Sequence, residues 1–258
     1  MKSVRTFGPL VLALLLLVGG SLPASAGEAF TIAAGAGYRK LVSALGEAYA
    51  KTGKPLPQQV YGNMGQVIAQ AKQSGVVDLV IGDKKFLDKA ELDVAAEYAI
   101  GKGRPVLAVA KGCPSAAWKG RKVLDAAGAK ALLADPAVAR IALPDPKKAI
   151  YGRAATEFME RSGLAQGVAG KLLPVGTVPQ VSAYVVSGEV DLGFINLTDG
   201  LAIKDKAAAV IPLDESLFDP IRIVADSLKT SPNPAAAAEF GAFLATPAAR
   251  EIVAAQGL

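Results

Sequence analysis

The chain has 258 residues, of which 52% are hydrophobic, so it is long enough to bury one substantial core or two modest ones. It contains no histidine and a single cysteine, which excludes Ser-His and Cys-His nucleophilic catalysis, histidine metal sites and intramolecular disulfides. The formal charge of +5 is far below that of a typical nucleic-acid-binding domain, so we expect no nucleic-acid partner.

Residues 1–26 have the features of a secretory signal peptide. Two basic residues precede the apolar run 10–18, and Ala24-Ser25-Ala26 supplies a small-residue cleavage site. The apolar run is too short for a comfortable membrane span, and an uncleaved anchor is the alternative. We predict a soluble mature chain with a net charge of +3, from 26 basic and 23 acidic residues, that is exported to the periplasm without stable membrane insertion.

Two segments join a short strand to a glycine-containing turn and the start of a helix. The first is residues 31–41, in which Gly35 and Gly37 follow the apolar positions of the strand. The second is residues 59–65, which precede a helical pattern. Free N–H groups and the positive end of the helix dipole make such a turn suitable for an anion or an oxygen-rich ligand. The same pattern is also typical of plain α/β packing.

Strands and helices alternate along the rest of the chain. Residues 76–81 form a nearly continuous apolar run, as expected of a strand buried on both faces of a parallel sheet. We predict further strands at 104–110, 140–143, 173–175, 191–196, 210–212 and 221–224, and helices at 86–92, 124–133, 149–162, 178–186, 234–244 and 247–255. This alternation predicts an α/β fold with mainly parallel sheets.

Glycine and proline residues mark two places where the chain crosses between lobes. Gly103-Arg104-Pro105 is the first, and Asp219-Pro220 is near the second. We predict two lobes with a hinge between them, the first from residues 28–104 and 225–258 and the second from residues 105–224.

Short motifs spread over nearly the whole mature chain are shared with one known family. They are Ile32-Ala-Ala-Gly-Ala36, Val77-Asp-Leu-Val-Ile81, Pro105-Val-Leu-Ala-Val109, Asp145-Pro146 with Ile150-Tyr151, Leu192-Gly-Phe-Ile195 with Asp199, and Pro247-Ala-Ala-Arg-Glu-Ile252. With these motifs the chain resembles the type II periplasmic solute-binding proteins, in particular the molybdate-binding proteins of ABC transporters. The resemblance implies two α/β lobes that close on a ligand about a hinge.

In that family a tetrahedral oxyanion is held by hydroxyl groups and backbone N–H groups without a counter-cation. The resemblance places the hydroxyl positions on Ala36, on Asn63-Met64-Gly65 and on Asn196, none of which carries a hydroxyl. It places the backbone N–H positions near Ala149 and at Val178, where the donor does not depend on the side chain.

Three hydroxyl donors are therefore missing together, which predicts weak or absent molybdate binding, because each charge-assisted hydrogen bond contributes roughly 1.5–3 kcal/mol. Candidate replacements are the amides of Asn63 and Asn196, the hydroxyls of Tyr38, Tyr61 and Tyr151, and the charges of Arg39, Lys147 and Lys148. Packing or solvent exposure is the alternative for each, and Met64 is typical of a core residue. The predicted ligand site is Ala36, Gly37, Tyr38, Asn63, Met64, Gly65, Ala149, Tyr151, Val178 and Asn196.

These observations predict a non-enzymatic solute-binding protein with no cofactor and no metal. By resemblance, we expect a monomer that captures a molybdate- or tungstate-like oxyanion and passes it to the permease of an ABC transporter. The alternative is a module of the same fold that binds a small organic ligand for sensing or for another uptake or export pathway, or a rare enzyme on this fold. Amides accept as well as donate hydrogen bonds, which favours a ligand that carries donors of its own.

Overall fold

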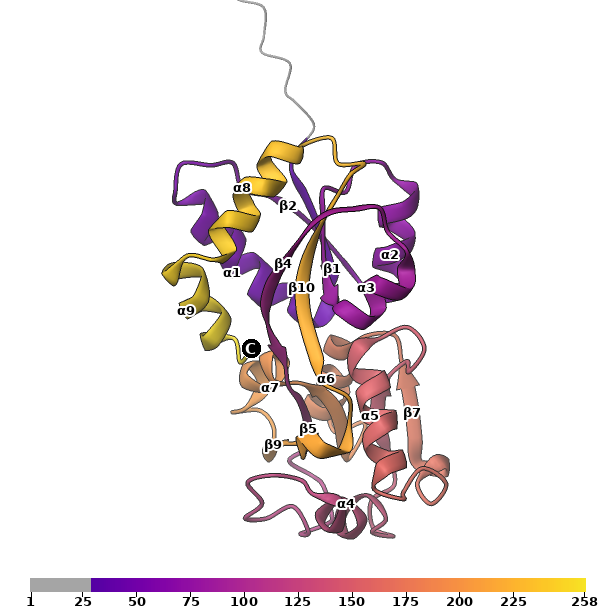
Figure 1. The fold of residues 1–258 in the computed structure, drawn as a ribbon. Helices are drawn as coiled ribbons and strands as arrows, with labels where there is room; N and C mark the ends of the chain where they lie inside the picture. The colour runs from indigo at the N-terminus through magenta and orange to yellow at the C-terminus, as the bar shows by residue number, and fades with distance from the viewer. Residues whose placement is uncertain (1–28) are drawn as a thin grey trace, which may run out of the picture.

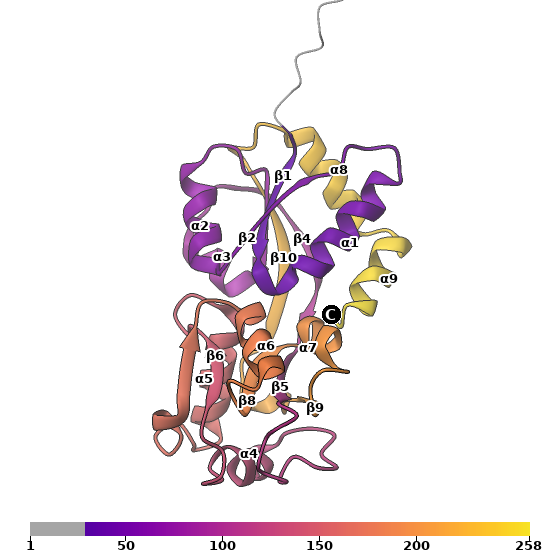
Figure 2. The same ribbon diagram turned by 180° about the vertical axis from the view of Figure 1, so that it is seen from behind.

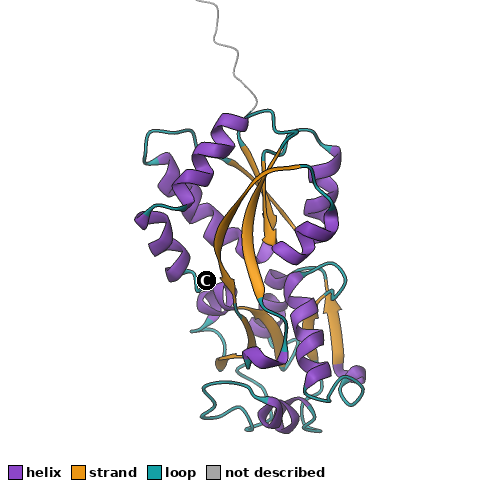
Figure 3. Ribbon diagram, viewed as in Figure 1, coloured by secondary structure: helices purple, strands orange, loops and turns teal. Residues whose placement is uncertain are grey.

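The computed structural model describes residues 29–258, and the predicted signal peptide lies outside this range. The described chain folds into two α/β lobes, each built on a five-stranded sheet with helices packed around it (Figures 1 and 3). No helix within residues 29–258 is both long enough and apolar enough to cross a membrane.

The first lobe contains a sheet with the strand order β2-β1-β3-β10-β4. Its strands are β1 (Thr31–Gly35), β2 (Gln58–Gly62), β3 (Leu79–Asp83), β4 (Val94–Gly103) and β10 (Ile221–Leu228). Its helices are the 3-10 helix η1 (Ala36–Tyr38), α1 (Arg39–Ala50), α2 (Met64–Gln73), α3 (Lys84–Ala90), α8 (Pro234–Leu244) and α9 (Pro247–Ala255). Views from opposite sides show α2 and α3 on one face of the sheet and α1 and α8 on the other (Figures 1 and 2).

The second lobe contains a sheet with the strand order β7-β6-β8-β5-β9. Its strands are β5 (Pro105–Val109), β6 (Ile141–Pro144), β7 (Leu172–Val175), β8 (Leu192–Asn196) and β9 (Ala209–Pro212). Its helices are α4 (Ala126–Leu133), α5 (Ile150–Arg161), α6 (Val178–Ser187), α7 (Leu197–Ile203) and the short 3-10 helices η2 (Ala169–Lys171) and η3 (Glu215–Leu217). In Figure 1, α4 lies at the end of this lobe that is farthest from the first lobe.

The central strands are buried along their whole length, as the apolar runs of the sequence predict. Every residue of β1, β3, β5, β6 and β8 is buried. The two C-terminal helices begin at Pro234 and Pro247, which the sequence also predicts, because proline fits the first turn of a helix.

Both sheets are mixed, whereas the alternation of strands and helices predicts mainly parallel ones. Among the described residues, each sheet has two parallel and two antiparallel pairings. The antiparallel pairings all involve β10 in the first sheet and β5 in the second. These strands enter their sheets directly from the other lobe, without the helical crossover that parallel neighbours require.

Two elements are absent from the sequence-based prediction. The edge strand β4 alternates between exposed and partly buried residues, and its alanines and glycines make this alternation weak in the sequence. The helix α7 has seven residues, which is too short for a clear helical period.

The chain crosses between the lobes at two places. At the first crossing, β4 ends at Gly103 and β5 begins at Pro105. After the second crossing, β10 pairs with β4 from Ile221 onward.

Candidate functional site

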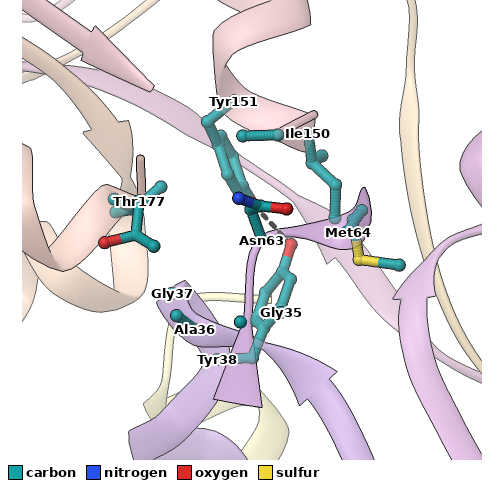
Figure 4. A pocket seen from close by; sticks show the side chains of 12 residues that line it. Gly35, Ala36, Gly37, Tyr38, Asn63, Met64, Ile150, Tyr151 and Thr177 are labelled. Atoms are coloured by element: carbon teal, nitrogen blue, oxygen red, sulfur yellow. Dashed lines mark hydrogen bonds between the residues drawn. The ribbon is translucent and has the colours of Figure 1, made fainter. Parts of the chain in front are cut away.

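The starts of four helical segments meet between the two lobes (Figure 4). The segment η1–α1 and helix α2 belong to the first lobe, and α5 and α6 belong to the second. They follow β1, β2, β6 and β7, so the pocket lies at the carboxyl ends of parallel strands, where ligands gather in open α/β sheets. The pocket is lined by Gly35, Ala36, Gly37, Tyr38, Gly62, Asn63, Met64, Ala149, Ile150, Tyr151, Thr177 and Val178.

None of the twelve side chains that line this pocket is charged. The first turn of each helix has backbone N–H groups without an intrahelical partner, and the aligned peptide dipoles place a partial positive charge there. Four helix starts directed at one pocket therefore favour a negatively charged or oxygen-rich group that has no counter-cation.

A pair of tyrosine hydroxyls joins the two lobes at the pocket. The hydroxyl oxygens of Tyr38 and Tyr151 are 2.6 Å apart, and both side chains are buried. Burial, reinforced by the neighbouring Tyr151, raises the pKa of Tyr38 well above its ordinary value. Burial likewise raises the pKa of Tyr151. Both groups are thus neutral hydroxyls, which can donate a hydrogen bond to an anion.

Asn63 has a structural role and also reaches the pocket. Its side-chain oxygen accepts a hydrogen bond from the backbone N–H of Gln66, and the Gln66 side chain accepts one from the backbone N–H of Asn63. This reciprocal capping box fixes the start of α2. The amide nitrogen of Asn63 has no hydrogen-bond partner among residues 29–258, so it remains available as a donor.

The structure brings together eight of the ten residues of the predicted ligand site, and Gly65 and Asn196 lie outside the pocket lining. Asn196 is 1% exposed, and both of its polar atoms have partners. Its amide nitrogen donates to the Gly37 carbonyl oxygen at 2.7 Å, and its oxygen accepts from the Asp199 backbone N–H at 3.0 Å. Asn196 therefore caps α7 and ties the second lobe to the first. Gly65 instead lines a neighbouring groove.

The other candidate donors lie away from the pocket lining. The Tyr61 hydroxyl donates to the Gln59 side chain at 2.6 Å, and the Arg39 guanidinium lies 4.2 Å from the centre of the Tyr61 ring. Lys147 lines the same groove as Gly65, and Lys148 packs against Gly65 across the lobe boundary. Met64 lines the pocket but is 1% exposed, with its side chain packed against Gly35 and Gly82.

Four lining residues, Gly35, Gly62, Ile150 and Thr177, are missing from the sequence-based site. Thr177 is the most informative, because it is the N-cap residue of α6 and makes no side-chain capping bond within that helix start. Its hydroxyl is a further candidate donor. A threonine two residues before Pro179 is a recognisable helix-start signal, so the sequence could have revealed it.

The pocket is small, with a cavity volume of about 30 Å³. A ligand with several heavy atoms therefore enters only when the lobes separate or the Tyr38–Tyr151 hydroxyl contact opens.

An ion pair also crosses the lobe boundary beside the pocket. The Arg153 guanidinium on α5 lies 3.1 Å from the Asp83 carboxylate at the end of β3, and it also pairs with Glu157 at 2.7 Å. Asp83 is fully buried, and burial raises the pKa of its carboxyl although Arg153 opposes the shift. Together with the tyrosine and asparagine contacts, this pair holds the lobes against each other.

Two α/β lobes that meet at a pocket lined by helix starts define a class of protein that binds small solutes. A family model described as bacterial extracellular solute-binding protein matches residues 30–258, and the chain belongs to this family. Its motifs correctly indicated a type II periplasmic solute-binding protein.

Named relatives lie among the molybdate-binding proteins. The chain is 29% identical over 248 residues to the molybdate-binding protein ModA of Rhodobacter capsulatus, covering 93% of this chain and 92% of that protein. The fold is similar to the periplasmic molybdate-binding protein of Azotobacter vinelandii, with a TM-score of 0.77 at 21% identity over 88% of this chain and 97% of the other. It is also similar to the substrate-binding domain of a putative molybdenum ABC transporter from Clostridium difficile, with a TM-score of 0.64 at 25% identity over 88% and 96%.

Proposed function

We propose that this protein captures a small oxyanion-bearing solute in the periplasm and delivers it to an ABC transporter. The observation that carries the proposal is the convergence of four helix starts on a pocket whose lining has no charged side chain. Such a pocket neutralises an anion through backbone N–H groups and helix dipoles. The names of its relatives support an oxyanion ligand and a transporter as the partner.

The protein binds its ligand without converting it. The pocket lining offers no carboxylate, thiol or lysine, and the chain has no histidine, so the site has no general base of the usual kind. Ligand entry separates Tyr38 from Tyr151. The two hydroxyls then donate hydrogen bonds to the bound anion and no longer bond to each other. Closure of the lobes around the ligand completes the cycle of capture.

Within the oxyanion class, we propose that molybdate binds more weakly than in a site with three hydroxyls at the family positions. Ala36 and Met64 supply no side-chain donor, and the Asn196 amide is already hydrogen-bonded. The Asn63 amide and the hydroxyls of Tyr38, Tyr151 and Thr177 are the remaining candidates.

The test begins with native mass spectrometry of the purified protein and a thermal-shift series with molybdate, tungstate, sulfate and phosphate. An oxyanion present at 100 times its dissociation constant stabilises the fold by about 2.7 kcal/mol. Calorimetry then ranks the affinities. Tight binding of molybdate would contradict the proposed specificity, and the absence of stabilisation by any anion would contradict the proposed function.

Substitutions of the tyrosine pair locate the site. We expect Tyr38→Phe and Tyr151→Phe each to weaken oxyanion binding by about 10- to 100-fold, because each removes a charge-assisted hydrogen bond of roughly 1.5–3 kcal/mol. Calorimetry measures the loss. Tyr98→Phe, on β4 and outside the pocket lining, is the matched control and should leave the affinity unchanged. Equal affinities for all four proteins would place the ligand elsewhere.

A small organic ligand is the second candidate. The tyrosine hydroxyls favour it, because they can accept as well as donate hydrogen bonds. A series of small organic acids in the same thermal-shift experiment separates the two classes.

A further inference from the structure

A basic groove lies beside the pocket and also crosses the lobe boundary. It has a cavity volume of about 480 Å³, against about 30 Å³ for the pocket. Its lining comes from α2 and α3 of the first lobe and from the β6–α5 segment of the second. These residues are Gly65, Ile68, Lys85, Phe86, Lys89, Ala90, Pro146, Lys147 and Arg153.

The groove and the pocket are adjacent, although no described residue lines both. At the start of α2, residues 63 and 64 line the pocket and Gly65 lines the groove. Around the start of α5, residues 149–151 line the pocket, and residues 146, 147 and 153 line the groove. A Cβ atom on Gly65 would lie 3.6 Å from the Lys148 side chain, so these two residues meet at the boundary between the lobes. A ligand that spans the pocket and the groove therefore has to pass the first turn of α2, where these two residues meet.

The charges that line the groove are all positive. Lys85 and Arg153 are already paired, Lys85 with Asp219 and Arg153 with Asp83 and Glu157. Lys89 and Lys147 are exposed and have no salt-bridge partner among residues 29–258. Two cations without an ion-pair partner in the described chain thus line the same groove from opposite lobes, and the lining contains no carboxylate.

The floor of the groove is apolar. Ile68 and Phe86 are partly buried, Ala90 is buried, and Pro146 lies on the opposite wall. Methylene groups can pack on such a floor while a charged end stays in contact with the lysines and with water. An inorganic oxyanion in the pocket would contact neither the apolar floor of the groove nor the lysines that line it.

We propose that the natural ligand is an organic dianion, with an oxyanion head in the pocket and a second acidic group in the groove between Lys89 and Lys147. This inference rests on the proposed function, which assigns the head group to the pocket, and it adds the chemical class of the solute. Because the groove is formed from both lobes, the second acidic group also favours the closed arrangement of the lobes.

The test uses pairs of probes that differ only in the second acidic group. Carboxyalkyl phosphates with one to four methylene groups are compared by calorimetry with alkyl phosphates of the same length. We expect at least one carboxyalkyl phosphate to bind about tenfold more tightly than its alkyl partner. This advantage should shrink by about two- to fivefold in Lys89→Gln and in Lys147→Gln, as expected of partly exposed ion pairs, and disappear in the double variant.

The control is Lys130→Gln on α4, at the far end of the second lobe, which removes one positive charge at a site distant from both cavities. In this variant the carboxyalkyl phosphate should keep its full affinity advantage over the alkyl phosphate. Equal affinity of each probe pair, or an equal loss for both members of a pair in the double variant, would overturn the inference. In that case, binding of sulfate, molybdate or an alkyl phosphate would leave the proposed function intact. Binding of none of these anions would instead remove the proposed function itself.

Discussion

Asn63 and Asn196 carry the same side-chain amide but make different hydrogen bonds in the folded protein. Asn63 uses its oxygen to cap α2 and keeps its amide nitrogen free at the pocket. Asn196 uses both groups, one to cap α7 and one to bond to Gly37 in the other lobe. A donor that is already satisfied inside the protein adds little to ligand affinity, because binding would exchange one hydrogen bond for another.

Asp226 differs from Asn196, whose polar atoms all have partners, because it is a buried carboxyl with one oxygen that accepts no hydrogen bond from the described part of the chain. It lies on β10, is 4% exposed, and one of its oxygens has no hydrogen-bond partner among residues 29–258. Burial, together with the nearby carboxylates of Glu97 and Asp88, raises the pKa of Asp226 to about 6, and Lys84 opposes the shift. The charged form of Asp226 therefore costs stability.

We expect Asp226→Asn to stabilise the protein at neutral pH. Because the pKa is above the ordinary 3.8 in the folded state, the cost of ionisation is absent below pH 3.8 and complete above about pH 6. Urea denaturation should show a gain of about 1–3 kcal/mol at pH 7.5 that falls below about 1 kcal/mol at pH 4. Asp205→Asn, at an exposed position, is the control. A gain of equal size at both pH values would contradict this explanation.

Among the secondary-structure elements, the starts of η1 and α6 lie close together across the lobe boundary. A Cβ atom on Gly37 would lie 3.0 Å from the Asn196 amide nitrogen and 3.2 Å from the Val178 Cβ, both in the second lobe. Both distances are tighter than ordinary van der Waals contact. The absence of a side chain at Gly37 therefore lets the two helix starts face the same pocket.

Gly37→Ala should weaken ligand binding without unfolding either lobe. The added methyl group pushes against α6, and overpacking of this kind costs about 1–3 kcal/mol, which corresponds to roughly a 5- to 150-fold loss of affinity. Calorimetry measures the affinity, and small-angle scattering measures the expected increase in the radius of gyration. Gly112→Ala serves as the control, since a Cβ atom there would meet nothing within 4 Å. Unchanged affinity in Gly37→Ala would rule out this contact as a limit on closure.

At the scale of the whole molecule, contacts on several sides of the pocket hold the lobes together. The tyrosine pair, the Asn196–Gly37 bond and the Arg153–Asp83 ion pair lie near the pocket. A further bond joins α7 to the C-terminal segment, where the Thr198 hydroxyl donates to the Gln256 carbonyl oxygen at 2.7 Å. The contacts of Asn196, Arg153 and Thr198 favour the closed arrangement and lie outside the pocket lining, so ligand affinity depends on residues that do not touch the ligand.

Thr198→Val tests this dependence with a nearly isosteric change. Loss of one hydrogen bond of about 0.5–1.5 kcal/mol across the lobes should lower ligand affinity by up to about tenfold. Calorimetry with an oxyanion that binds the unmodified protein gives the measurement. In the control Thr156→Val, the lost bond runs to the Gly152 carbonyl within α5, and affinity should not change. A similar effect in both variants would indicate general destabilisation instead.

The local units of this protein follow from short stretches of its sequence. The buried strands, the glycine-containing turn before α1 and the proline starts of α8 and α9 follow from hydrophobic runs and from backbone preferences, which act over a few residues. The family motifs indicated the solute-binding class in the same way, because they are short segments that can be compared residue by residue.

Which donors remain free, and which groups surround them, depends on how distant segments of the chain pack together. Tyr38 meets Tyr151 across 113 residues of chain, and Asn196 meets Gly37 across 159. The mixed sheets, the edge strand β4 and the basic groove likewise depend on segments that the two crossings between lobes bring together. No local spacing encodes such pairs, because a side chain's partners are set by how the lobes pack, and that packing satisfied the Asn196 amide inside the protein.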